Sequence, residues 1–222
     1  MDLSVRATES ELLDEGVSET DALESLADLR RVNRWLGTYR RLAAAAGPFL
    51  ASSARPRLLD VGCGSADIPE RILRSFPGPL LAVGVDLKLL HLRAAPPSVR
   101  RVVADARALP FPPGAFDVVL ASHFLHHFDG AKAAAVLRRL YDLARRALIV
   151  DDIRRARVPY VLARSFFPFL LRSPVSVADG VLSIRRAFTV GELAAAFAEA
   201  GIPVRIQRVF PYHLLAVARK SA

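Results

Sequence analysis

The chain alternates short apolar runs with segments in which apolar residues recur every three or four positions. Runs of this length that stay apolar throughout are typical of strands buried on both faces of a parallel sheet. The expected strands occupy residues 57–61, 80–86, 99–104, 116–121 and 147–150, and the expected helices between them occupy 68–76, 87–94 and 130–145. We therefore predict an open α/β sheet with helices on both faces.

The two ends of the chain depart from this alternation. An acidic arm over 1–20 precedes one long helix over 21–46, which Gly47-Pro48 should end. Residues 153–188 form an insert with three prolines and a phenylalanine cluster. A capping-box helix over 189–200 and two strands over 203–210 and 212–219 follow. We expect an N-terminal arm and helical cap over 1–50 and the main domain over 51–222.

Composition excludes several classes of protein. With 222 residues and 52% hydrophobic content, the chain can bury a proper core and is not disordered. A single cysteine, Cys63, rules out a disulfide framework and a multi-cysteine zinc site. No apolar run has the length of a membrane span and no secretory signal opens the chain, so we expect a cytoplasmic protein. The net charge of +9 is compatible with binding to nucleic acid, to a membrane surface or to an anionic ligand. It can also reflect only the bias of GC-rich coding toward arginine.

The most informative stretch is a glycine loop after the first expected strand. Gly62 and Gly64 stand two residues apart where a strand meets a helix. Glycine lets the backbone turn sharply and lets a ligand lie against it, although a plain tight turn has the same sequence. Asp86 ends the next expected strand, where its carboxylate can accept hydrogen bonds from both ribose hydroxyls of an adenosine. Asp105 ends the third expected strand, where it can accept a hydrogen bond from the adenine amino group.

Carboxylates beside this loop discriminate between adenosine ligands. Asp60 precedes Gly62 by two residues, and Asp67 follows Gly64 by three. Anionic side chains there repel a pyrophosphate but suit a ligand that carries an ammonium and a sulfonium. The loop therefore favours S-adenosylmethionine (SAM) over NAD or FAD.

Three motifs in this order, LLDVGCGSADIP, VGVDLK and VVADARALPFPPGAFDVVLASHFLHHF, resemble those of class I SAM-dependent methyltransferases. The resemblance implies a Rossmann-like sheet of seven strands, mostly parallel with an antiparallel last strand. Ala66 departs from it, since many members have a third glycine there. The cofactor contacts that it implies are Asp60, Gly62 and Gly64 to the methionine end, Asp86 and Leu87 to the ribose, Asp105 and Ala106 to the adenine, and Ser122 near the sulfur.

The ends of the chain are similar to a narrower bacterial group encoded beside type III polyketide synthases. The matching segments are 29–36, 151–155 and 179–189. This similarity implies a role in secondary metabolism, with methylation of phenolic lipids or related polyketides.

Transfer to a phenol needs help in ionising the hydroxyl. Histidines follow the fourth expected strand, and we predict His126 or His127 as the base, with Asp152 orienting it or binding a substrate hydroxyl. Each can instead be a core or capping residue. We predict no metal, since no nearby carboxylate or cysteine completes the histidine pattern.

The acceptor should bind under the cap and the insert. The predicted acceptor contacts are Trp35, Tyr39, His123, Phe166 and Arg185, each of which can also be ordinary core or solvated surface. The insert, flanked by Arg164 and Arg172, also predicts a peripheral membrane contact. We expect a monomer or homodimer. We expect no nucleic-acid partner, because the motif after the fourth strand differs from that of nucleic-acid methyltransferases.

The favoured function is O-methylation of a small phenolic or polyketide-derived molecule. A quinone-type C-methyltransferase is the nearest rival, and a non-catalytic SAM-binding or scaffold protein is the rival from another class.

Overall fold

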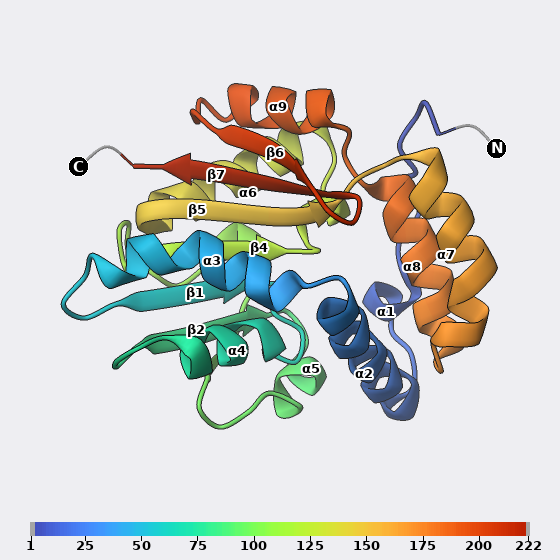
Figure 1. Cartoon of the computed structure of the whole chain (residues 1–222), viewed down its shortest axis with the longest axis horizontal. Coiled ribbons are helices and arrows are strands. Elements are labelled where there is room, and N and C mark those ends of the chain that lie inside the picture. The colour runs from blue at the N-terminus through green and yellow to red at the C-terminus, as the bar shows by residue number, and fades with distance from the viewer. Residues whose placement is uncertain (1–2, 221–222) are drawn as a thin grey trace.

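The computed structural model describes residues 3–220. Its centre is a seven-stranded sheet in the order β3-β2-β1-β4-β5-β7-β6, in which β7 runs antiparallel to both neighbours, β5 and β6. The predicted α/β architecture is therefore confirmed (Figure 1). The strands are β1 (Arg57–Val61), β2 (Leu81–Asp86), β3 (Arg100–Val103), β4 (Phe116–Ser122), β5 (Ala144–Ile153), β6 (Arg205–Val209) and β7 (His213–Arg219).

Helices cover both faces of the sheet, and further helices lie at the carboxyl ends of its parallel strands (Figure 1). The α-helices are α1 (Leu12–Glu15), α2 (Glu19–Trp35), α3 (Thr38–Ala51), α4 (Asp67–Ser75), α5 (Leu89–Arg93), α6 (Gly130–Leu143), α7 (Arg157–Leu170), α8 (Pro174–Arg186) and α9 (Val190–Glu199). Two short 3₁₀ helices, η1 (Ala106–Ala108) and η2 (Leu125–His127), follow β3 and β4.

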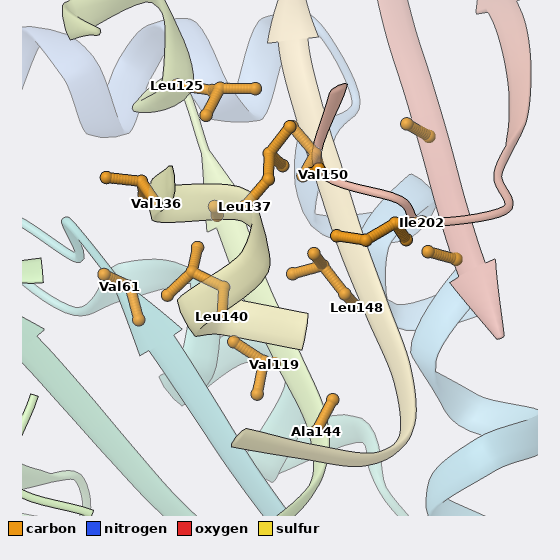
Figure 2. Packing of buried hydrophobic residues seen from close by; sticks show 14 of the residues in the cluster. Val61, Val119, Leu125, Val136, Leu137, Leu140, Ala144, Leu148, Val150 and Ile202 are labelled. Carbon is orange, nitrogen blue, oxygen red and sulfur yellow. The ribbon is translucent and has the colours of Figure 1, made fainter. Parts of the chain in front are cut away.

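Strand alternation divides the core between the two faces. Val118 and Leu120 of β4 pack with α3 and α4, whereas Val119 of the same strand packs with α6 and α9. Figure 2 shows the second layer, with Leu137 and Leu140 of α6 set over the strands. Since helices cover both faces of the sheet, side chains on both sides of each central strand are buried. This burial explains the continuous apolar runs of the sequence.

The N-terminal helix differs from the expectation. The single helix predicted over 21–46 is wrong, because α2 ends at Trp35 and α3 begins at Thr38. Gly37 between them has φ +68°, a left-handed conformation that glycine adopts without cost. The break expected at Gly47-Pro48 is also wrong, since α3 continues to Ala51. Pro48 lies inside α3 without ending it, although the helix loses the backbone hydrogen bond that residue 48 would otherwise donate.

The 153–188 insert is a helical hairpin. Helices α7 and α8 pack against each other, and α8 also contacts α1 and α2. Figure 1 shows these four helices grouped at the carboxyl ends of β1, β4 and β5, with α7 outermost. None of the described helices has the length and apolar character that a bilayer crossing needs.

Candidate functional site

A cavity of about 480 Å³ opens at the carboxyl ends of the parallel strands, within the range of small-molecule sites. Its floor is the glycine loop and the ends of β1, β2 and β4, and its cover comes from α1, α2 and α8. All eight predicted cofactor residues line it: Asp60, Gly62, Gly64, Asp86, Leu87, Asp105, Ala106 and Ser122. Their contacts with a cofactor stay predictions.

The glycine loop has the backbone that its sequence requires. Gly62 and Gly64 have φ of +69° and +53°, and Ala66, at the position of the missing third glycine, has φ +54°. A Cβ on Gly62 would come within 2.1 Å of the Phe124 ring. Gly62 therefore has two reasons to lack a side chain, its dihedral angle and the close approach of Phe124.

Carboxylates surround this loop as predicted. Asp60 is buried, and its Oδ2 has no hydrogen-bond partner. Burial first, then the charges of Asp67 and Asp86, raise the pKa of Asp60 well above its usual value. Asp86 accepts hydrogen bonds from the backbone N–H groups of Gly64 and Lys88, both at 2.9 Å. An unpartnered buried carboxylate in this surplus of negative charge fits a cationic ligand.

A first histidine cluster, made of His126 and His127 with their carboxylate neighbours, lies next to α8. His126 Nδ1 lies 2.7 Å from Asp152 Oδ1, and its Nε2 faces Glu11 Oε1 at 3.3 Å without an aligned hydrogen bond. His127 Nδ1 lies 2.7 Å from Asp14 Oδ2. Burial opposes the charged imidazolium, but the two carboxylates flanking His126 raise its pKa. A protonated His126 has no lone pair to take a proton, so this geometry does not support it as a general base.

The acidic arm reaches this cluster because α8 holds it there. Asp179 accepts hydrogen bonds from the N–H groups of Leu12 and Leu13, at 2.8 and 2.9 Å. Arg186 donates to the carbonyl oxygens of His127 and Glu9, at 2.9 and 2.7 Å. These bonds fix α1 against η2, and the arm is part of the site.

A second histidine cluster lies on the other side of β5. Arg41 binds both carboxylate oxygens of Asp151, at 2.9 and 2.7 Å, and also lies 3.0 Å from Nδ1 of His213. The ring of His213 meets that of His123 edge to face, with centroids 4.9 Å apart. Burial, followed by the charge of His213, lowers the pKa of His123 to about 4.

His123 combines three features of a reacting group. It lines the cavity, its buried Nε2 has no partner, and its φ of +49° is a strained conformation for a non-glycine residue. With its pKa near 4, the imidazole is neutral at physiological pH and keeps a lone pair.

Four predicted acceptor contacts lie outside the lining of the cavity. Trp35 and Phe166 are 55% and 53% exposed. Arg185 pairs with Glu9 at 3.1 Å, and Tyr39 donates a hydrogen bond of 2.7 Å to Asp67, which does line the cavity. Sequence reasoning missed Glu11 and Asp14 as site residues, and both line the cavity.

Comparisons with known proteins agree with this geometry. Residues 58–147 match the family model described as "Methyltransferase domain". The "EEF1A lysine methyltransferase 4" of Mus musculus is 33% identical over 94 residues, which cover 39% of this chain and 34% of that protein. This chain therefore spans about a third of that relative's length.

Two solved structures share the fold over most of their length. The plantazolicin methyltransferase BpumL, solved with a pentazolic desmethylPZN analog and SAH, superposes with a TM-score of 0.67 at 12% identity, over 92% of this chain and 97% of that one. The magnesium protoporphyrin IX methyltransferase ChlM from Synechocystis PCC 6803, solved with SAH, gives 0.60 at 19% identity, over 86% and 85%.

Residues 58–147 are thus similar to methyltransferase domains, and the chain shares its fold with these two solved methyltransferases.

Proposed function

We propose that this protein transfers a methyl group from SAM to the oxygen of a small phenolic or polyketide-derived acceptor. The observation that carries the acceptor side is His123, a neutral imidazole that lines the cavity and whose buried Nε2 has no hydrogen-bond partner. A phenol has an ordinary pKa near 10, so a hydrogen-bond acceptor at its hydroxyl assists the loss of the proton during transfer.

The lining of the cavity supports an aromatic acceptor. Away from the carboxylates, the lining is apolar and comes from three regions of the chain that meet only in the fold. These side chains are Leu29, Val32, Leu36, Phe124, Phe128, Ile153, Phe167 and Leu171.

The reaction is an in-line displacement on the methyl carbon. An acceptor oxygen must lie about 3 Å from that carbon, opposite the sulfur. The acceptor O–C bond forms as the S–C bond breaks, and SAH leaves. The proton of the hydroxyl passes to Nε2 of His123 and then to solvent.

A variant of His123 tests this role. His123→Asn suits the left-handed backbone, because asparagine tolerates positive φ, but it cannot take the proton. Transfer from labelled SAM to a panel of phenols should fall about 10²- to 10⁴-fold in kcat. Affinity for SAH, measured by calorimetry, should stay unchanged. Full activity in this variant would contradict the role.

Product analysis tests the transfer to oxygen. The wild-type product should show an O-methyl ether resonance by NMR, whereas a C-methyl arene would favour the quinone-type rival. Absence of any transfer across the panel, with SAH still bound, would favour the non-catalytic rival.

We also propose that α7 rests on an anionic lipid surface, of the kind that a cytoplasmic leaflet presents. Its outer face exposes Val158, Val161, Leu162, Phe166, Phe169 and Leu170. The exposed Arg157, Arg164 and Arg172 flank this face, and no acidic residue occurs from 153 to 178. An apolar face rimmed by cations is typical of interfacial helices.

Liposome flotation tests this contact. The wild type should float with vesicles of anionic phospholipid, and Phe166→Glu with Phe169→Glu should abolish the binding. Phe210→Glu is the matched control, because Phe210 is 90% exposed, like Phe169 at 86%, but lies outside α7. Wild-type protein that stays with the unbound fraction, or a double variant that still floats, would contradict the contact.

A further inference from the structure

The first histidine cluster has a pattern that hydrogen bonding alone does not explain. Each imidazole directs Nδ1 to an aspartate and Nε2 to the same glutamate. For His126 the partners are Asp152 at 2.7 Å and Glu11 at 3.3 Å. For His127 they are Asp14 at 2.7 Å and Glu11 at 3.8 Å.

This arrangement is the one that metal-binding histidines adopt. A ligating imidazole usually gives its second nitrogen to a carboxylate, which fixes the tautomer and the ring orientation. Here Asp152 occupies that outer position for His126, and Asp14 lies 2.7 Å from Nδ1 of His127 without an aligned hydrogen bond. The two imidazole rings also stack, with centroids 4.5 Å apart, so that both Nε2 atoms approach one carboxylate.

The separations suit a shared cation better than direct ion pairs. A charge-assisted hydrogen bond between nitrogen and carboxylate measures about 2.7–2.9 Å. Ligands about 2.1 Å from a tetrahedral metal lie about 3.4 Å from one another. The distances of 3.3 and 3.8 Å to Glu11 fall near the second value. His126 Nε2 is buried without a hydrogen-bond partner and faces this space, in a side chain only 2% exposed.

Charge also favours a cation at this position. Among the described residues, no arginine or lysine forms an ion pair with Glu11, Asp14 or Asp152. Arg186 and Arg6 donate instead to backbone carbonyls of residues 126–128. The second histidine cluster differs, since the Arg41 guanidinium already occupies the space between Asp151 and His213.

We propose that Glu11, His126 and His127 bind a divalent transition-metal ion, with Zn²⁺ the ion that two imidazoles and a carboxylate suit best. All three residues line the cavity, so a metal ion held by them would be accessible from it. If the proposed function holds, the metal ion receives the acceptor oxygen, whose ionisation it favours. Metal binding displaces the proton that His126 carries in the metal-free protein, and it does not depend on methyl transfer.

Metal titration with a matched pair of variants tests the site. Full-length protein is freed of metal with a chelator, dialysed, and titrated with Zn²⁺ by calorimetry. The wild type should take up one equivalent, and Glu11→Gln should weaken binding by at least about tenfold. Glu15→Gln, an exposed glutamate on the same arm, should bind as the wild type does. Equal binding by Glu11→Gln, or no binding by the wild type, would overturn the proposal.

Two further readouts separate this inference from the proposed function. The d–d spectrum of the Co²⁺-loaded wild type should show nitrogen and oxygen ligation, and Glu11→Gln should lose that spectrum. A Co²⁺ spectrum that is identical in both proteins would overturn the proposal. SAH is titrated into the same samples: SAH binding without Zn²⁺ binding removes only the metal site, whereas loss of SAH binding removes the proposed function.

Discussion

The two histidine clusters begin from adjacent residues of one strand but differ in what balances their charge. Asp151 and Asp152 of β5 point to opposite faces of the sheet because side chains alternate along a strand. Asp151 meets the guanidinium of Arg41, whereas Asp152 meets the imidazole of His126. A permanent cation, Arg41, makes the second histidine cluster structural, whereas the first cluster holds its carboxylates with imidazoles that a metal ion can use.

The difference also bears on His123, the histidine that we propose contacts the acceptor. Arg41 satisfies Asp151, so that aspartate does not raise the pKa of His123 enough to overcome burial. His123 therefore stays neutral next to the structural cluster, with its Nε2 left for the acceptor.

Removing the fixed cation should have the largest effect. Arg41→Met leaves Asp151 buried without its cation, and the free energy of unfolding should fall by about 3–5 kcal/mol. Urea denaturation measures this loss. Arg40→Met, the exposed neighbour, is the matched control and should change stability by less than about 0.5 kcal/mol. Equal effects of the two substitutions would show that Arg41 has no special structural role.

The pH dependence of stability should show the neutral state of His123. Its pKa is about 4 in the folded chain against 6.5 for a free histidine, so the unfolded chain binds more protons between these values. The stability that the neutral imidazole contributes is complete above pH 6.5 and is lost as the pH falls toward 4. Wild type should lose about 2–3 kcal/mol relative to His123→Asn across this window. Parallel curves for the two proteins would contradict the shift.

The smallest expected effect concerns the hydroxyl that holds Glu11. Ser183 Oγ donates a hydrogen bond of 2.6 Å to Glu11 Oε1. In the other cluster, the carboxylate of Asp151 instead accepts hydrogen bonds from the guanidinium of Arg41. Ser183→Ala should cost only about 1.5 kcal/mol, the lower end of the range for a hydrogen bond to a charged group. Ser165→Ala, on the exposed face of α7, is the control in the same thermal denaturation assay. A loss as large as that of Arg41→Met would remove the contrast between the clusters.

Sequence patterns predicted the parts of the molecule that depend on neighbouring residues. The strands and the glycine loop followed from local runs, and the ends of consecutive parallel strands meet at one edge. Asp60, Asp86 and Asp105 therefore lie around one cavity, as the sequence indicates.

The parts that depend on distant contacts were beyond the sequence. Glu11 joins His126 only because Asp179 and Arg186 of α8 hold the arm, and no local pattern records that contact. Without Glu11, the histidines lacked a carboxylate and no metal was predicted. Strand alternation separates Asp151 from Asp152, but only the neighbouring helices decide which of them meets Arg41.

The protonation state of His123 tests the central claim most directly. The imidazole nitrogens of ¹⁵N-labelled protein can be followed by NMR as the pH is lowered, with His123→Asn identifying the resonance. A neutral ring that takes up its proton with a pKa near 4 is the predicted result. A pKa at or above 6.5 would show that burial does not keep His123 neutral and would contradict the account of this histidine.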